Sequence, residues 1–194
     1  MLSKNVVALV DYDNVAMELV GRGDTVLALA DVIKIVVDAI RREIPDVATL
    51  NLRLYGGWVD ELGYFSRPAE RILGELRYYR GRREGIRIAT SLALSLCAAP
   101  TVRLIGTVRS GTKQRQKMVD VMISLDAVHS AIDRGLVAII SDDDDLVPSA
   151  FLAARSGAMV SWFRHRNRAS CNDTTLIAES VSFYSLTQVA HERS

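Results

Sequence analysis

The stretch from Gly135 to Pro148, Gly-Leu-Val-Ala-Ile-Ile-Ser-Asp-Asp-Asp-Asp-Leu-Val-Pro, determines how the rest of the chain is interpreted. Leu136–Ile140 is a continuous run of apolar residues, typical of a strand buried on both faces of a parallel sheet. Four aspartates follow Ser141, and Leu146–Arg155 then has a helical pattern that ends at Ser156-Gly157. Acidic residues between a buried strand and a helix lie at the carboxyl edge of a sheet, where open α/β folds bind ligands.

Helix capping explains one or two of these aspartates, because aspartate is a good N-cap residue and acidic side chains suit a helix's first turn. Four adjacent carboxylates, Asp142 to Asp145, are more than a cap requires. Like charges repel one another, and a divalent cation is the obvious group to neutralise them. At this point a structural cap and a metal or catalytic site are both open.

Hydrophobic periodicity along the 194 residues predicts strands that alternate with helices. The expected strands are Asn5–Val10, Thr49–Tyr55, one or two within Ile86–Leu96, Thr101–Val108, Leu136–Ile140, Ala158–Phe163 and Val181–Leu186. The expected helices are Thr25–Arg42, Arg67–Arg83, Gln116 to about Asp133, Leu146–Arg155 and Thr174–Glu179. This alternation predicts an α/β fold: a single three-layer domain over residues 1–194, with a mostly parallel central sheet and helices on both faces.

The composition limits the class of protein. A formal charge of +1, from 24 Lys+Arg and 23 Asp+Glu, gives no global field for nucleic acid or membrane, so any such attraction must be local. The two cysteines and three histidines are scattered and show no zinc-binding spacing. No apolar run approaches the length of a membrane span and the N-terminus has no signal-peptide pattern, so we expect a cytoplasmic protein without a membrane partner.

Acidic residues from three segments are expected to converge. Asp11 ends the first strand and Asp143 follows the strand Leu136–Ile140, so both carboxylates lie at one edge if these strands are neighbours. The helix from Gln116 is apolar nearly all round, as a buried helix is, yet it contains Asp120. A buried carboxylate needs a partner, which is Lys117, a backbone or hydroxyl donor, or a metal.

A second acid on that helix, Asp126, is expected to have a supporting role by bonding backbone near the same edge. Three or four carboxylates around one crevice is how hard cations such as Mg²⁺ or Mn²⁺ are held. Such an ion can orient a water and polarise a phosphodiester.

These motifs, taken in order, resemble those of the NYN domain, a family of the PIN-like nuclease superfamily. The matching segments are Asp11-Tyr12-Asp13-Asn14, Lys117-Met118-Val119-Asp120 with Asp126, and Ser141 through Pro148, and the ending Leu176–Glu179 before the last strand is also similar. The resemblance spans almost the whole chain. It implies a PIN-like fold and a metal-dependent ribonuclease site.

The resemblance also assigns roles to residues. The metal-binding and catalytic acids are expected to be Asp11, Asp120, Asp143 and Asp145, with Mg²⁺ or Mn²⁺ as the cofactor. Asn14 is expected to orient Asp11 or contact substrate, and Ser141 to steady the acidic turn. The sequence departs from the family pattern at two positions: Asp142 stands where glycine is usual, and Asp144 stands where serine is usual. A glycine allows unusual backbone angles, so Asp142 can alter the shape of the turn.

Three basic segments could hold a polyanion: Arg77–Arg83, Arg109–Lys117 and Arg164–Arg168. The first interleaves tyrosines with arginines, which suits phosphate contact with base stacking but equally suits a solvated helix end. The other two are expected to be exposed loops near the acidic edge, with Arg109, Lys113, Arg115, Lys117, Arg164 and Arg166 as substrate-binding residues. A cationic rim around an acidic centre favours single-stranded or structured RNA as the partner, with DNA left open.

The sequence therefore favours a nuclease that hydrolyses RNA phosphodiesters with a metal-activated water. A non-catalytic module that binds RNA or protein is the alternative, because of the two extra aspartates. A small-molecule phosphohydrolase is a third reading, since Asp11-Tyr12-Asp13 resembles the nucleophile loop of haloacid-dehalogenase-like phosphatases, although Asn14-Val15 lacks that loop's hydroxyl residue. The segments Tyr55–Tyr64 and Ile88–Ala99 could be core or could contact a second copy of the chain.

Overall fold

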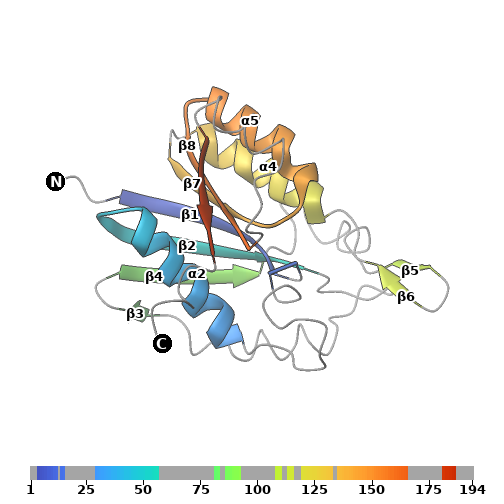
Figure 1. Ribbon diagram of the computed structural model, residues 1–194, viewed down its shortest axis with the longest axis horizontal. Helices are drawn as coiled ribbons and strands as arrows, with labels where there is room; N and C mark the ends of the chain where they lie inside the picture. The colour runs from blue at the N-terminus through green and yellow to red at the C-terminus, as the bar shows by residue number, and fades with distance from the viewer. Residues whose placement is uncertain are drawn as a thin grey trace.

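The computed structural model describes residues 4–12, 14–15, 29–56, 81–83, 86–92, 108–110, 113–115, 119–132, 135–165 and 181–186. These residues build a seven-stranded sheet with the order β3-β4-β2-β1-β7-β8-β9 (Figure 1). Its strands are β1 (Lys4–Asp11), β2 (Val47–Tyr55), β3 (Gly81–Arg83), β4 (Ile86–Leu92), β7 (Leu136–Ile140), β8 (Met159–Arg164) and β9 (Val181–Ser185). The helices are α2 (Leu29–Glu43), α4 (Val119–Ile132) and α5 (Val147–Arg155), with a 3₁₀ turn at Asp144–Leu146.

The sheet is parallel except at one edge, where β3 pairs with β4 in the antiparallel sense. From β1 the chain moves outward through β2 to β4, and it later returns to β7 on the other side of β1. The topological switch point therefore lies between β1 and β7, whose last paired residues are Val10 and Ile140. In open α/β sheets, ligands bind outside the carboxyl ends of the strands at this point.

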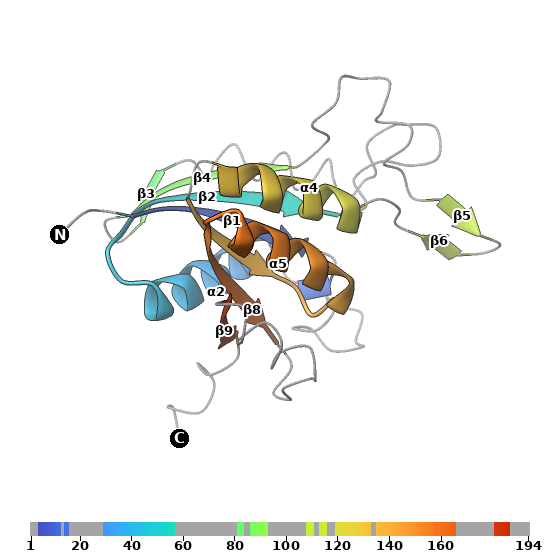
Figure 2. The ribbon, with the colours of Figure 1, turned by 90° about the horizontal axis from the view of Figure 1, so that it is seen from above.

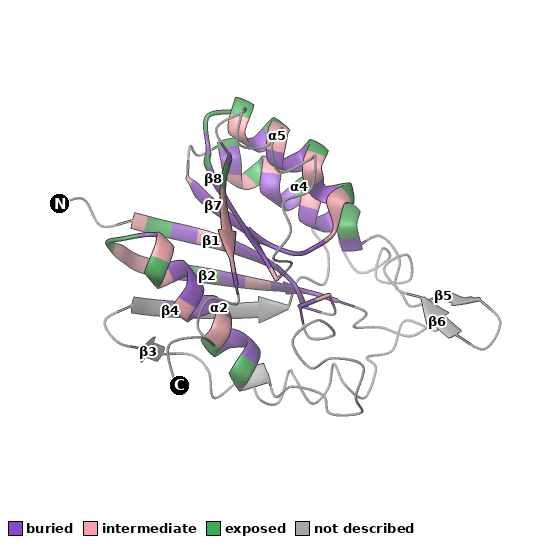
Figure 3. Cartoon of the chain, viewed as in Figure 1, coloured by how far each residue is buried: buried purple, intermediate pink, exposed green. Residues whose placement is uncertain are grey.

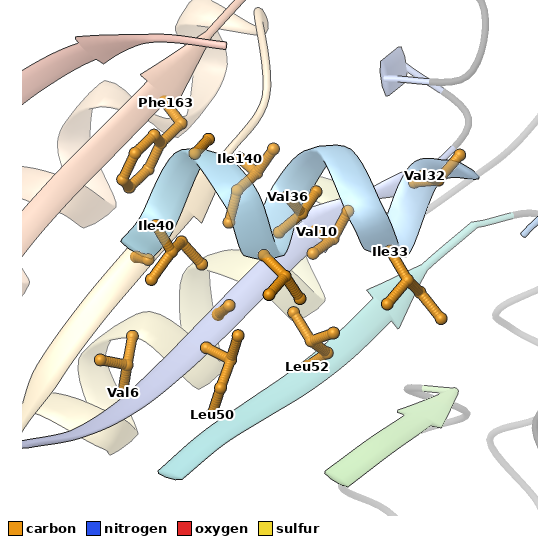
Figure 4. Close-up of a cluster of buried hydrophobic side chains, with 14 of the residues drawn as sticks. Val6, Val10, Val32, Ile33, Val36, Ile40, Leu50, Leu52, Ile140 and Phe163 are labelled. Atoms are coloured by element: carbon orange, nitrogen blue, oxygen red, sulfur yellow. The ribbon is translucent and has the colours of Figure 1, made fainter. Parts of the chain in front are cut away.

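Helices cover both faces of the sheet, α2 on one and the pair α4 and α5 on the other (Figures 1 and 2). Alternate residues of β1 explain this layering, because Val6 and Val10 pack with α2 whereas Leu9 packs with α4 and α5. Figure 4 shows the α2 side of the core, where Val36 and Ile40 face the strands. The mostly parallel α/β sheet with helices on both faces is the fold that the sequence predicts.

Two predicted segments are wrong in part. The predicted helix Arg67–Arg83 cannot reach its stated end, because Gly81–Arg83 forms β3; residues 67–80 lie outside the described residues. Glycine disfavours a helix, and here the backbone pairs with Ile86–Ile88 instead.

The predicted loop Arg109–Lys117 contains a hairpin of β5 (Val108–Ser110) and β6 (Lys113–Arg115). The two short strands pair in the antiparallel sense, with Ser110 opposite Lys113. Figures 1 and 2 both place this hairpin beyond the carboxyl ends of β1 and β2. The predicted strand Thr101–Val108 is described only at Val108, and the predicted helix Thr174–Glu179 lies outside the described residues.

Helix α4 is less buried than its composition predicts. Ile123 and Ala127 are fully buried against the sheet, but Val121 and Leu125 are 49% and 57% exposed (Figure 3). Only one side of the helix packs, because α4 lies in an outer layer of the fold. In the part of the chain that the structure describes, no helix has the length and apolarity needed to cross a membrane.

Candidate active site at the carboxyl edge of the sheet

The predicted acids Asp11 and Asp143 lie at the topological switch point. Asp11 is the last residue of β1, and Ser141 directly follows β7, the neighbouring strand. The side chains of both residues are almost fully buried. The hydroxyl of Ser141 donates a hydrogen bond of 2.9 Å to Oδ2 of Asp11. The ends of the two strands are therefore joined by side chains as well as by backbone pairing.

The same group of contacts fixes the start of the acidic turn. The Ser141 hydroxyl oxygen accepts a hydrogen bond of 3.1 Å from the backbone N–H of Asp143. Oδ1 of Asn14 accepts one of 3.0 Å from the N–H of Asp142, and the N–H of Asn14 lies 3.4 Å from Oδ1 of Asp11. Asn14 and Ser141 therefore hold the turn on the end of β1.

The four aspartates of the turn have different partners. Oδ1 of Asp142 accepts a hydrogen bond of 2.9 Å from the N–H of His165, and Oδ1 of Asp144 accepts one from Nη2 of Arg164. Oδ1 of Asp143 caps the 3₁₀ turn by accepting a bond of 3.0 Å from the N–H of Asp145. The two extra aspartates thus contact the end of β8, and capping accounts for one further oxygen.

The backbone of the turn is ordinary despite the missing glycine. Among the described residues, only Asp46 and Gly157 have a positive φ. Asp142 therefore does not occupy the left-handed region in which a glycine is needed.

Asp120 is the acid of α4 that faces this turn. It lies in the first turn of the helix. Although the residue as a whole is exposed, partial desolvation of its carboxyl raises the pKa of that carboxyl. The negative charges of Asp143 and Asp145 raise the pKa of Asp120 further. These three acids therefore interact electrostatically at the carboxyl edge.

The candidate donors for a metal ion are the carboxylates of Asp11, Asp120, Asp143 and Asp145. Within the described ranges, no group of three or more aspartate, glutamate, histidine or cysteine side chains is arranged to hold a metal. The chemistry of the donors suits a hard cation, because they are carboxylates whose mutual repulsion a cation relieves.

Asp126 has different partners from those predicted. Its Oδ2 accepts a hydrogen bond from the Tyr55 hydroxyl and lies 3.1 Å from Nη1 of Arg53, both on β2. These are side-chain contacts, so the predicted bond to backbone is wrong. Burial, followed by the Asp126 carboxylate, raises the pKa of the Tyr55 phenol far above its usual range. Asp126 therefore ties the middle of α4 to β2.

The prediction that Arg164 lies in an exposed basic loop is wrong. Instead of starting an exposed loop, this residue ends β8 and is fully buried. Arg164 has the same strand parity as the buried Trp162, so it faces the core that contains α4 and α5. Arg109, Lys113 and Arg115 belong to the hairpin β5–β6, whereas Lys117 and Arg166 lie outside the described residues.

Sequence reasoning missed three residues around this site. Trp162 donates a hydrogen bond of 2.7 Å from Nε1 to the carbonyl oxygen of Ser141, and Tyr55 and Arg53 bind Asp126. Strand alternation could have indicated that Trp162 and Arg164 point inward together. The partners of Asp126 could not be found in this way, because they depend on how α4 sits on β2.

The fold and the site together define an α/β protein with an acidic cluster at the switch point of a mostly parallel sheet. Comparison of the chain with protein-family models, with curated proteins and with solved structures finds no match in any of the three.

Proposed function

We propose that this protein is a metal-dependent ribonuclease that hydrolyses RNA phosphodiester bonds at the carboxyl edge of the sheet. Mg²⁺ or Mn²⁺ would be held by Asp120, Asp143 and Asp145, with Asp11 as the fourth candidate ligand. The proposal agrees with the resemblance to the NYN domain, and a cytoplasmic location suits an RNA substrate.

One observation carries the proposal: at the switch point of the sheet, Asp11 accepts a hydrogen bond from Ser141 at the start of the acidic turn, and the charges of Asp143 and Asp145 in that turn act on Asp120 of α4. Asp143 and Asp145 raise the pKa of Asp120, so the cluster repels itself and favours a bound cation. Helix capping explains the hydrogen bond from the N–H of Asp145 to Asp143. It does not explain why Asp120 lies within reach of the negative charges of Asp143 and Asp145. The repulsion among these carboxylates supports a site for a hard cation in preference to a purely structural turn.

The chemistry assigned to the site is hydrolysis without a protein nucleophile. When bound, the metal supplies an activated water and neutralises charge on the phosphate. The acids of the chain orient that centre, and Ser141 and Asn14 hold the turn through their bonds to Asp11 and Asp142. The expected products carry 5′-phosphate and 3′-hydroxyl ends.

The basic hairpin β5–β6 favours RNA as the substrate. The strands β5 and β6 contain Arg109, Lys113 and Arg115 and precede α4, whose first turn contains Asp120. The hairpin lies beyond the carboxyl edge in both ribbon views (Figures 1 and 2). Cationic side chains neutralise phosphates, so we assign the hairpin and Lys117 to RNA binding.

Cleavage of a labelled single-stranded RNA in Mn²⁺ or Mg²⁺ tests the function. We expect cleavage that EDTA abolishes and that Asp143→Asn reduces at least about 100-fold, because a residue that holds the reacting centre is removed. The matched control is Asp38→Asn, the same substitution on α2 at the opposite face, which should cleave like the unaltered protein. Full activity in Asp143→Asn contradicts the assignment.

A non-catalytic RNA-binding module is the second candidate. It is favoured by the finding that no group of three metal-binding side chains is preassembled in the described ranges. This module would shift RNA on a gel in EDTA and would cleave none in Mn²⁺, which separates it from the nuclease in the same experiment.

A further inference from the structure

The end of β8 contacts the acidic turn at several points. Trp162 donates its indole N–H to the carbonyl of Ser141, and the N–H of Ser141 donates to the carbonyl of Phe163 over 3.2 Å. The N–H of His165 donates to Asp142, and the guanidinium of Arg164 donates to Asp144. The last three residues of β8 and the residue that follows it thus bind three residues of the turn.

Arg164 is the unusual member of this set, because its charged side chain is fully buried. Its guanidinium carbon lies 5.1 Å from the ring centre of Trp162 and 6.0 Å from that of Phe183. Two aromatic rings and the Asp144 carboxylate therefore surround the cation. A planar guanidinium can stack and donate a directed hydrogen bond at once, which an ammonium group does less well.

The contacts of Arg164 bear on which acids face α4. Asp142 and Asp144 are bound to the end of β8, and the charges of the neighbouring Asp143 and Asp145 act on Asp120. Asp144 begins the 3₁₀ turn Asp144–Leu146, and Oδ1 of Asp143 caps that turn through the N–H of Asp145. Binding Asp142 and Asp144 to the end of β8 therefore fixes the backbone that carries Asp143 and Asp145.

We propose that Arg164 is a positioning residue, which binds Asp144 and thereby fixes the 3₁₀ turn and the placement of Asp143 and Asp145. This inference rests on the proposed function for its catalytic consequence, but the geometric claim is independent of it. The charge of Arg164 also compensates the extra carboxylate of Asp144, which replaces the serine usual in the family that the chain resembles.

The test combines a spectroscopic measurement with cleavage. The variants are Arg164→Met, which keeps the apolar stem, Arg164→Lys, which keeps the charge, and Asp144→Asn, which keeps the buried arginine. The matched control is Arg155→Met, since Arg155 also lies over an aromatic ring, Phe151 at 5.5 Å, but is exposed on α5. Nitrogen–proton spectra follow the Trp162 indole and the amides of Asp143 and Asp145, with Trp58→Phe to assign the two indoles.

Arg164→Met and Asp144→Asn should move the Trp162 indole and the two amide signals in the same way, with a smaller change in Arg164→Lys and none in Arg155→Met. With Mn²⁺ and single-stranded RNA, kcat should fall about 10- to 100-fold in Arg164→Met, because misplaced acids cost rate more than binding. KM should change less than about threefold, since no substrate contact is removed.

Unchanged turn signals in Arg164→Met and Asp144→Asn overturn the proposal, whatever happens to cleavage. If Arg164→Met does not fold, Asp144→Asn and Arg164→Lys decide the question by the same signals. Shifted signals in a protein that never cleaves RNA support the positioning role and refute the ribonuclease, so the two failures are distinguishable.

Discussion

The hydroxyl of Tyr55 offers the sharpest test of how α4 is held on the sheet. Tyr55 is the last residue of β2, is fully buried, and donates a hydrogen bond to Asp126 on α4. Tyr55→Phe removes this donor and leaves the ring in place. Because Asp120 lies on the same helix, the contact also helps to place the candidate site.

The size of the effect follows from the contacts that remain. A hydrogen bond to a charged group contributes about 1.5–3 kcal/mol to stability. Arg53 stays 3.1 Å from Oδ2 of Asp126, so the carboxylate keeps one partner, and a loss of about 2 kcal/mol in the free energy of unfolding is expected. For a chain of this length, that loss lowers the melting temperature by roughly 4–8 °C.

Denaturant unfolding followed by circular dichroism measures this change. The matched control is Tyr184→Phe, because Tyr184 is half-buried and stacks on Phe163 with ring centres 5.2 Å apart. Removing its hydroxyl leaves that stacking intact and should change stability by less than about 0.5 kcal/mol. Equal losses in the two variants would refute the assignment of the Tyr55–Asp126 bond as a structural tie.

Three further predictions concern the turn and α4. Asp144→Asn should lower the free energy of unfolding by about 2 kcal/mol. This loss is below the usual cost of breaking a buried ion pair because the Asp144 side chain is 37% exposed. Asp145→Asn should not destabilise the protein, and urea unfolding of the two variants measures the difference. Asp120 has a raised pKa in the folded state, so its charge destabilises the fold as pH rises through that pKa. Asp120→Asn should therefore be more stable than the unaltered protein at pH 7 and should lose this advantage below pH 3.8. Melting curves at several pH values measure this difference. Ile123→Ala should cost about 2–5 kcal/mol by thermal unfolding, whereas Leu125→Gln on the exposed side of the same helix should change stability by less than about 0.5 kcal/mol.

The sequence predicts the sheet well because its buried strands are local signals. Leu136–Ile140 and Val181–Ser185 are apolar or alternating segments whose pattern needs no partner to be recognised. Strand Gly81–Arg83 has no such pattern, since it exists only through pairing with β4. Short edge strands of this kind depend on long-range contacts more than on their own residues.

For the candidate site, the sequence predicts which residues meet but not how each is used. The parallel neighbours β1 and β7 bring Asp11 to the acidic turn, as expected from two strands that end in acid. The burial of Arg164 was missed because a run of basic residues indicates a surface, although the alternation of β8 places this side chain inside. Charge composition and strand parity gave opposite indications, and strand parity was the better guide.

The distance along the chain between the two halves of the site has a consequence for its biosynthesis. Asp11 and Ser141 are 130 residues apart, and β7 is made long after β1, α2, β2 and β4. Contacts of such sequence separation close late in folding, because the entropy of a long loop must be overcome first. A nascent or truncated chain that ends before β7 can therefore pair β1 with β2 while Asp11 still lacks the acidic turn. The site can form only after β7 has docked, so the activity assigned to it would be acquired only after β7 and the acidic turn have been synthesised.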